Sequence, residues 1–422
     1  MPLVLLCNYN VKVCFVALPL LLLFFATLSF AEIFECVFFF MAFSSVSPFF
    51  TGMLTALVLV TFIRYIVDVK KHKRPVHWLI VLVSSVIFVI FTCVFYEVSI
   101  GGFYNWALMT GLLFGGYLIF VYRDEIRIGR AFYFLIAGLI ISALASGIVL
   151  LTKIQGYEVL PFDGVYNRAK FFTRHTNHLS MFSIFSLTYL AYLFANSKVN
   201  QIKDLFLNTK AIVHICLFLC VALIGFLTLS KTFLIMFSGI CVYLMIVLVL
   251  KLKTKSLYII LPLLAVGVAL GFVFADFVEV LIDRFSAYYT SGTLLTQILT
   301  NRDQVWIEYF KISTKSIWTI LFGVGMLTKG VGFGAHNVLV YLFFRIGVVG
   351  LLLSTLLVWL YAKQVKTKTK ITFFNFLPLF VFVILSMIEM TLSDRFFLFL
   401  VVGLLLLFAK TENQPTENDK NF

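Results

Sequence analysis

The sequence predicts an all-α polytopic membrane protein with about 12 or 13 transmembrane helices, and both its composition and its apolar runs point to this class. Hydrophobic residues make up 62% of the 422 positions and charged residues only 12%, and phenylalanine alone accounts for 50 positions. Soluble domains carry about 25% charged residues, and disordered chains have the opposite composition. The apolar residues fall into runs of about 20, the length with which an α-helix crosses the hydrocarbon core.

The predicted membrane spans follow one another along nearly the whole chain. We expect them near residues 13–30, 50–67, 77–95, 103–121, 131–152, 179–196, 210–229, 232–251, 257–275, 337–361, 372–391 and 395–409. The stretch 32–47 is apolar but short, so it is either a further span or a half-crossing. The side on which the N-terminus lies depends on this stretch and stays open.

Lysine and arginine concentrate in the short loops on one side of the alternating path. Cytoplasmic loops are enriched in these residues, so we assign this side to the cytoplasm, together with the polar tail 410–422. The basic loop residues on this side are Lys70, Lys71, Lys73, Arg74, Arg123, Arg127, Arg130, Lys198, Lys203, Lys210, Lys251, Lys253, Lys255, Lys363, Lys366, Lys368 and Lys370.

The domain organisation follows from these spans. Residues 1–275 form the N-terminal spans and include an external segment at 153–178. Residues 276–336 form a large extracytoplasmic loop, and residues 337–409 form the last three spans. A loop of about 60 residues is long enough to be functional rather than a plain connector.

The large loop has two features of its own. Its apolar stretch from Ile307 to Ile320 predicts amphipathic helices that lie along the membrane face. The glycines that follow predict a flexible approach to the next span. These glycines are Gly323, Gly325, Gly330, Gly332 and Gly334, and their spacing is not that of a phosphate-binding P-loop.

The net charge of +14 indicates contact with anionic lipid rather than with nucleic acid. No basic domain lies outside the apolar spans, so nucleic acid is not an expected partner. The seven cysteines lie in or beside apolar runs without a CxxC pair, which predicts small apolar packing residues rather than a metal or redox site.

Several basic residues fall on the external side, where the positive-inside rule expects few. Arg168, Lys170 and Arg174 crowd the segment 153–178, and Lys231 lies at an external turn between two spans. Arg302 and Lys311 lie in the large loop. Two interpretations remain open: each residue contacts lipid phosphate, or several converge on a phosphorylated ligand, for which the arginine fork is well suited.

A second candidate feature is the pair His336-Asn337 at the start of a predicted span, followed by Arg345, Gly347 and Gly350. A single histidine at a helix start is most often a cap or an interface residue. Histidine is also the side chain best suited to accept a hydroxyl proton near neutral pH. His336 lies on the same predicted side as the external basic residues.

These residues form an ordered pattern that resembles the O-antigen ligase and polymerase superfamily. His336-Asn337, nine residues, Gly347, two residues and Gly350 resemble its HNx9GxxG signature. Arg302 to Trp306 is similar to its RxxxW element, and Leu321 to Gly325 to its lfGvG element. Ser230-Lys231 falls where many members have Ser-Arg, and Arg174 to His178 is similar to its R-x-x-x-N-h element. The resemblance covers about residues 165 to 405, and its one departure is Lys231 in place of arginine.

The resemblance implies an integral-membrane, C-type-like glycosyltransferase with an undecaprenyl-diphosphate glycan as donor. It implies His336 as the base for the acceptor hydroxyl, and Arg302, Lys231 and Arg174 as contacts to the diphosphate. The supporting residues would be Asn337, Arg168, Lys170, His178 and Arg345. His175 and His178 have a spacing seen in metal sites but no acidic or cysteine neighbours, so neither a metal nor a cofactor is expected.

The leading functional expectation is polymerisation of lipid-linked repeat units into O-antigen, capsular or exopolysaccharide, at the outer face of a bacterial cytoplasmic membrane. A ligase that transfers the finished glycan to lipid A core or another acceptor stays open as the alternative. A transporter or flippase is more distant, because it would carry ionisable or helix-breaking positions near mid-membrane in paired halves. The expected partners are the lipid-linked donor, the acceptor glycan, membrane lipid, a repeat-unit flippase and a chain-length regulator.

Overall fold

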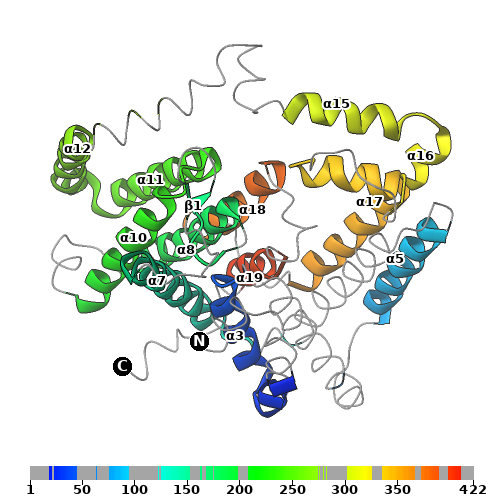
Figure 1. The fold of residues 1–422 in the computed structure, drawn as a ribbon, viewed down its shortest axis with the longest axis horizontal. Coiled ribbons are helices and arrows are strands. Elements are labelled where there is room, and N and C mark those ends of the chain that lie inside the picture. Colours follow the sequence, from blue (N-terminus) through cyan, green and yellow to red (C-terminus); the bar gives the residue numbers. More distant parts are fainter. Residues whose placement is uncertain are drawn as a thin grey trace. The chain divides into compact units, whose positions relative to one another are not determined.

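The protein is a mostly helical, multi-pass membrane protein (Figure 1). The computed structural model describes residues 19–20, 23–44, 63, 76–94, 122, 125–152, 162–163, 168–173, 175–197, 208–273, 275, 279, 282, 302–325, 335–365, 372–388 and 398–409. Within these ranges, five helices are long and apolar enough to cross a membrane. They are Ile128–Leu151, Thr176–Asn196, Thr209–Phe226, Lys231–Pro262 and Val338–Leu356.

The elements lie close to the predicted spans. They are α3 (Phe30–Met41), α5 (Val76–Val94), α7 (Ile128–Thr152), β1 (Phe162–Asp163), β2 (Arg168–Ala169), α8 (Thr176–Asn196), α10 (Thr209–Phe226), α11 (Lys231–Leu252), η1 (Lys253–Ser256), α12 (Leu257–Val273), α15 (Arg302–Ser313), α16 (Ile317–Phe322), α17 (Val338–Val365), α18 (Leu377–Ile388) and α19 (Leu398–Ala409). The predicted span 103–121, all of 50–67 except residue 63, and residues 13–18, 21 and 22 of the span 13–30 lie outside the described residues.

The apolar stretch 32–47 forms the short helix α3. Ser29 caps this helix, because its hydroxyl accepts the Glu32 amide N–H and the Glu32 carboxylate accepts the Ser29 amide N–H. The 12 residues of α3 extend about 18 Å, whereas the hydrocarbon core is about 30 Å thick. The helix length therefore fits the half-crossing alternative rather than a complete further span.

Two short strands depart from the all-α expectation. β1 and β2 pair antiparallel in the external segment, with Phe162 opposite Ala169 and Asp163 opposite Arg168. The pairing of β1 with β2 provides backbone hydrogen bonds in this connecting segment, in place of those of a helix. Ala169 adds one more bond, since its N–H donates to the Leu227 carbonyl oxygen at 2.9 Å.

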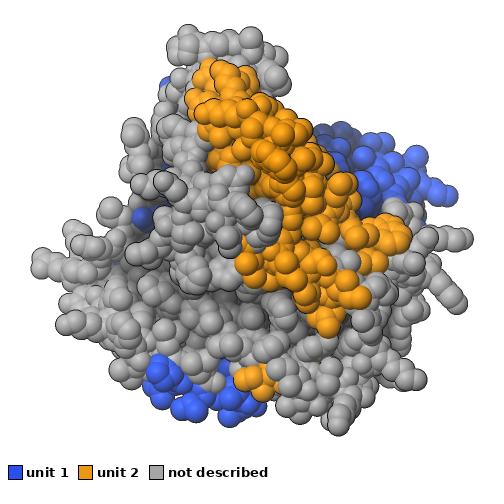
Figure 2. Space-filling model, turned by 90° about the vertical axis from the view of Figure 1, so that its right-hand side faces the viewer, with its two compact units in different colours: residues 1–54, 127–290, 371–381 blue, residues 55–126, 291–370, 382–422 orange. Residues whose placement is uncertain are grey.

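The chain divides into two compact units (Figure 2). The first contains residues 1–54, 127–290 and 371–381, and the second contains residues 55–126, 291–370 and 382–422. In the first unit α8 is the central helix, almost wholly buried and in contact with α7, α10 and α11. Its serine and threonine side chains bond back to its own backbone or pack as small residues, which permits close approach between membrane helices.

In the second unit α17 is the helix against which the others pack. α5, α15 and α16 all contact α17, and its path bends at Gly347, where the backbone is non-helical with φ 60° and ψ −166° (Figure 1). α17 coincides with the predicted span 337–361, and the bend is an additional feature. The segment 338–346 and the segment 348–365 are two helices joined at this bend, which hydropathy alone does not reveal.

Candidate active site

In the second unit, the start of α15 contacts the segment before α17 through Trp306. We call Arg302 and Trp306, together with Ala335, His336 and Asn337, the histidine corner. Arg302 begins α15, and Trp306 lies one turn later on the same face of that helix. The indole Nε1 of Trp306 donates a hydrogen bond of 2.6 Å to the carbonyl oxygen of Ala335. The arginine–tryptophan element is therefore attached to the residue directly before His336.

Asn337, not His336, caps the following helix. The Asn337 Oδ1 accepts the amide N–H groups of Leu339 at 2.9 Å and Val340 at 3.1 Å. Its Nδ2 donates to the Met387 carbonyl oxygen in α18 at 3.2 Å. Because the cap is a buried asparagine, the histidine side chain has no capping role here.

His336 is half-buried and its backbone lies in the left-handed region, with φ 48°. Few side chains adopt this conformation, although histidine does so more often than most. Such backbone strain persists where the surrounding structure enforces it, and it is found disproportionately at functional sites. The hydrogen bonds at the neighbouring residues Ala335 and Asn337 hold the backbone of His336 in this conformation.

A glycine-rich turn holds the bend of α17. Val324 N–H donates to the Phe344 carbonyl oxygen at 2.8 Å, and Gly325 N–H to that of Arg345 at 3.1 Å. Gly323 and Gly347 both have positive φ, and a Cβ on Gly347 would lie 2.5 Å from the Gly323 nitrogen. The expectation of a flexible approach was wrong for Gly323 and Gly325, which are held by these bonds. Gly330, Gly332 and Gly334 lie outside the described residues.

Arg345 is buried within this bend. Its Nη1 donates to the Gly325 carbonyl oxygen at 3.1 Å, and its guanidinium lies 5.4 Å from the Tyr341 ring centroid and 5.2 Å from that of Phe344. A guanidinium in these contacts stabilises the bend through a hydrogen bond and cation–π attraction. Its structural position is that of a scaffold residue.

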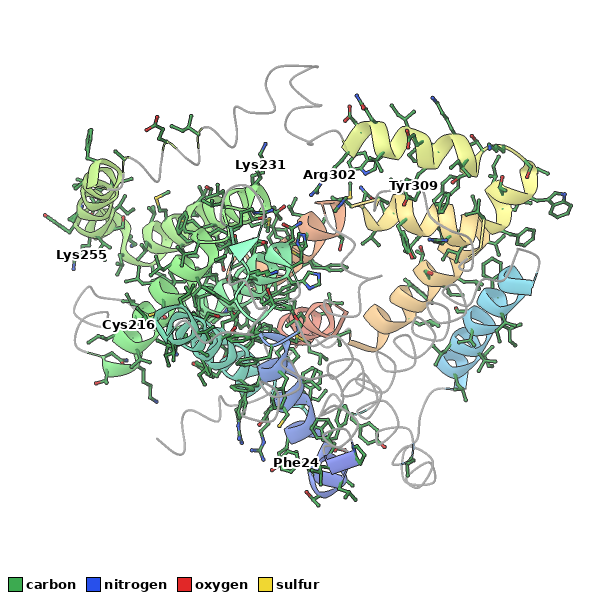
Figure 3. The ribbon with its side chains drawn as sticks, viewed as in Figure 1. Phe24, Cys216, Lys231, Lys255, Arg302 and Tyr309 are labelled. Carbon is green, nitrogen blue, oxygen red and sulfur yellow. The ribbon has the colours of Figure 1, made fainter. Side chains whose placement is uncertain are left out.

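Tyr309 anchors α15 on α17 beneath the histidine corner. Its ring meets that of Phe344 edge-to-face at a centroid distance of 4.6 Å, and Figure 3 shows it between the two helices. Val324, Ala335 and Val340 complete this buried cluster. Burial raises the pKa of the Tyr309 hydroxyl above its ordinary value, and the nearby Arg345 charge opposes this shift.

In the first unit, Arg168, Lys170, His178 and Lys231 belong to two adjoining segments that we call the basic turn. The Arg168 Nε donates to the Thr228 carbonyl oxygen at 3.0 Å, and its Nη2 donates to the Asn177 Oδ1 at 3.1 Å. Arg168 thus joins the external segment to the turn before α11. It is placed to position the turn rather than to contact a ligand with its full fork.

Lys231 is the first residue of α11 and is half-buried (Figure 3). Ser230 caps the helix, with its hydroxyl accepting the Phe233 N–H at 3.4 Å. Thr228 supports the cap, since its Oγ1 donates to the Gly225 carbonyl oxygen and accepts the Ser230 N–H. A lysine at a helix N-terminus adds its charge to the positive end of the helix dipole, which favours an anion at this turn.

The two histidines of the external segment have different surroundings. His175 caps α8, and its Nδ1 accepts the Asn177 N–H at 3.1 Å. The His178 ring lies 6.3 Å from both the His175 and the Phe182 ring centroids. Within the described residues no three His, Cys, Asp or Glu side chains gather as metal ligands. Arg174 lies outside the described ranges.

Sequence reasoning missed one ionisable pair. Glu35 in α3 is 3% exposed, and its Oε2 lies 3.3 Å from the Arg130 Nη2 in α7. The Glu35 Oε1 is buried and accepts no hydrogen bond from the described residues. A carboxylate inside an apolar run was the available signal, because such residues are rare in membrane helices and tend to be paired.

The geometry supplies two groups suited to different tasks. The histidine corner contains a half-buried imidazole, which can accept a proton, and an arginine at the start of α15, which can bind an anion. The basic turn holds a lysine at a capped helix start, which can bind an anion. Comparisons with protein-family models, with curated proteins and with solved structures find no match.

Proposed function

We propose that this membrane protein is a glycosyltransferase that polymerises undecaprenyl-diphosphate-linked oligosaccharide repeat units. The product would be an O-antigen, a capsule or an exopolysaccharide, formed at the outer face of a bacterial cytoplasmic membrane. The proposal rests on the motif resemblance to the O-antigen ligase and polymerase superfamily and on the contacts among those motifs.

One observation supports the proposal most directly. The hydrogen bond from Trp306 to the Ala335 carbonyl joins the RxxxW element to the histidine–asparagine element across 29 positions of sequence. The lfGvG element joins the same helix through the Val324 and Gly325 N–H groups. Three elements that were recognised separately in sequence therefore belong to one packed assembly.

The proposed reaction forms one glycosidic bond and breaks one bond between sugar and phosphate. A hydroxyl of the acceptor glycan attacks the anomeric carbon of the donor, and its proton passes to the His336 imidazole. The bond between the anomeric carbon and the phosphate oxygen breaks, and undecaprenyl diphosphate leaves with the bonding electron pair. Arg302 stabilises the negative charge that develops on this diphosphate.

The remaining residues have supporting roles in this proposal. Asn337 caps α17 and so holds the backbone at His336, while Arg345 holds the bend. In the first unit, Lys231 and Arg174 are proposed as contacts to phosphate oxygens, and Lys170 and His178 belong to the same basic turn. Arg168 acts by positioning the turn that carries Lys231, because two of its donors already bond protein atoms.

The experiment uses the full chain in proteoliposomes with purified, labelled lipid-linked repeat units and no other acceptor. Wild-type protein should produce a ladder of longer lipid-linked glycans, and His336→Ala should not. Lys255→Gln is a matched control, because Lys255 is an exposed basic residue in η1 that belongs to neither the histidine corner nor the basic turn. A ladder made equally well by His336→Ala would contradict the proposed role of this residue.

The ligase alternative gives a different outcome in the same assay. A ligase would leave the repeat units unchanged until an acceptor such as lipid A core is added, and would then transfer one finished glycan to it. Absence of any glycan transfer under both conditions, with folded protein, would contradict both versions of the proposal. Movement of intact donor across the bilayer would support the flippase alternative instead.

A further inference from the structure

We infer that the outer face of α15 and α16 is an interfacial anchor, which lies in the headgroup layer of a bilayer containing anionic phospholipid. The anchor residues are Ile307, Phe310, Lys311, Lys315, Ile317 and Trp318. This goes beyond the proposed function, because it concerns the membrane contact of the assembly and not the reaction.

Neither helix is long enough to cross the membrane. α15 has 12 residues and α16 has 6, so they extend about 18 Å and 9 Å, against a hydrocarbon core of about 30 Å. Each nevertheless carries large apolar side chains on its exposed side. A short helix with large apolar side chains exposed on one side can lie in the plane of the interface, with those side chains about 5–10 Å into the boundary region.

The bend of α17 indicates the depth at which these helices lie. Beyond Gly347, residues 348–365 extend about 27 Å, close to the thickness of the hydrocarbon core. This segment carries the exposed apolar side chains of Leu352, Leu356 and Trp359, as expected for a helix in lipid. The apolar window 338–356 is interrupted by this bend, so we place the crossing in the unbroken segment 348–365 and Gly347 near the membrane boundary.

The glycine turn transfers this depth to α16. α16 ends at Phe322, and the next residues donate hydrogen bonds to the Phe344 and Arg345 carbonyl oxygens, directly before Gly347. The contact between the Gly323 and Gly347 backbones leaves no room for a side chain. α16 is thus held at the level where α17 enters the membrane, and α15 connects to it through residues 314–316.

The exposed side of the helix pair has the composition of an interfacial surface. Ile307 is 52% exposed, Phe310 45%, Ile317 61% and Trp318 65%. The opposite side of α15 carries Tyr309 and Ser313, which are buried. Tryptophan in particular is enriched where membrane meets water, because its ring is apolar and its N–H is polar.

Two exposed lysines favour anionic over neutral lipid. Lys311 in the last turn of α15 and Lys315 in the connection to α16 flank the apolar side chains. Each lysine near an anionic surface contributes roughly 1 kcal/mol of attraction. Glu308 is also exposed, but it lies further round α15 than Lys311, away from Phe310.

The test measures the depth of Trp318 by quenching its fluorescence with brominated lipids in proteoliposomes of the full chain. The Trp318 signal is the difference between wild-type protein and Trp318→Phe, a change that keeps an aromatic ring beside Phe322. Lipids brominated near the headgroup should quench this signal at least about twofold more strongly than lipids brominated near the chain ends. Trp359→Phe is the matched control, since Trp359 lies about 18 Å beyond Gly347 and should show the opposite order.

The lipid charge is tested in the same way. Adding phosphatidylglycerol to phosphatidylcholine vesicles should increase the shallow quenching of Trp318 in wild-type protein. Lys311→Gln with Lys315→Gln should lose this increase, whereas Lys253→Gln with Lys255→Gln, two exposed lysines of η1, should keep it. Absence of quenching at Trp318, stronger quenching from the chain ends, or no effect of phosphatidylglycerol would overturn the anchor. None of these results depends on glycan transfer, so the proposed function is tested separately.

Discussion

At the scale of single residues, helix capping and the proposed proton acceptance belong to two neighbouring residues, Asn337 and His336. The cap belongs to Asn337, whose Oδ1 accepts two amide N–H groups. A general base typically contributes about 10²–10⁴-fold to a rate. His336→Ala and His336→Gln should therefore both reduce polymer formation by this factor. Glutamine forms hydrogen bonds, but it does not accept a proton near neutral pH. The measurement is the initial rate with purified lipid-linked repeat units at equal protein levels.

The control for this prediction changes the cap and leaves the imidazole. Asn337→Asp keeps the capping oxygen, and Asn337→Ala removes it, at about 1 kcal/mol of helix stability. We expect Asn337→Ala to lower the melting temperature more than either His336 variant does. An active His336→Gln would show that the residue binds or orients substrate and does not accept the proton.

Arg302 tests geometry against charge. If its guanidinium binds diphosphate through two donors, Arg302→Lys should lose about 10–100-fold in rate while the net charge stays the same. Lys231→Arg should be tolerated, since arginine keeps the charge at the start of α11 and is the more common residue in the resembled family. The same polymer assay measures both variants. Near-normal activity in Arg302→Lys with loss only in Arg302→Glu would assign Arg302 a general electrostatic role.

Motif spacing predicted His336, Asn337 and Arg302 as site residues, and their roles stay predictions. Residue type and spacing can be read from a sequence, whereas the contacts of these side chains cannot. Arg168 and Arg345 were predicted as supporting residues, but the sequence did not indicate what they bond. In the structure both donate hydrogen bonds to backbone carbonyl oxygens of their own unit.

At the scale of elements, the contact between Gly323 and Gly347 determines the bend of α17. A Cβ on Gly347 would lie 2.5 Å from the Gly323 nitrogen and from the Leu321 carbonyl oxygen, and its φ of 60° is unfavourable for alanine. Gly347→Ala and Gly323→Ala should each destabilise the protein by about 1–3 kcal/mol and reduce polymer formation. Thermal unfolding in detergent and the polymer assay measure the two effects.

Gly239 provides the matched control within the same chain. It lies inside α11, and a Cβ there would meet nothing within 4 Å. Gly239→Ala should leave the melting temperature unchanged or raise it, because alanine favours the helix. Equal behaviour of Gly239→Ala and Gly347→Ala would contradict the role of the close backbone contact.

The pair of α3 and α7 supports a further prediction. Glu35 is buried while the Arg130 side chain is 51% exposed, so the two partners differ in what their removal leaves behind. Arg130→Gln leaves an unpaired carboxylate among apolar side chains and should lower the melting temperature. The loss should stay below the roughly 3–5 kcal/mol found for fully buried pairs. Glu35→Gln should have a smaller effect, because Arg130 can reach solvent or lipid headgroups.

The double variant Glu35→Gln with Arg130→Gln shows whether the two side chains affect stability jointly or independently. If burial of an unpaired charge causes the loss, the double variant should be more stable than Arg130→Gln alone. Additive destabilisation would instead indicate that each side chain packs independently, and that their 3.3 Å approach adds little.

Hydropathy predicted the bounds of those helices whose position depends only on the length of an apolar run. The helices α7, α8, α10 and α11 begin and end within a few residues of the predicted spans, because about 20 apolar residues have few other stable arrangements in lipid. Hydropathy also predicted the position of α17 but not its bend, because one residue with positive φ divides an unbroken apolar run. It left α3 open, because the helix end at Met41 falls inside a run of apolar residues.

At the scale of the whole molecule, composition alone was sufficient for the class. A chain that is 62% hydrophobic and 12% charged has its apolar surface covered by lipid, and a multi-pass helical protein is the result. Sidedness is a finer property, and it depends on the few lysines and arginines outside the spans. It therefore stays a prediction that the large loop faces outward and the basic short loops face the cytoplasm.

The prediction of sidedness is tested with cysteines at two positions that are exposed in the structure, Gln304 in α15 and Lys255 in η1. Each is placed in a chain from which the seven native cysteines have been removed. In intact cells a membrane-impermeant maleimide should label position 304 and not 255, and both should react once the membrane is permeabilised. The physical basis is the excess of lysine and arginine in the short loops, which keeps those loops in the cytoplasm. Labelling of 255 but not 304 would place Arg302 and His336 on the cytoplasmic side, where an enzyme that extends a polymer outside the cell has no access to its acceptor.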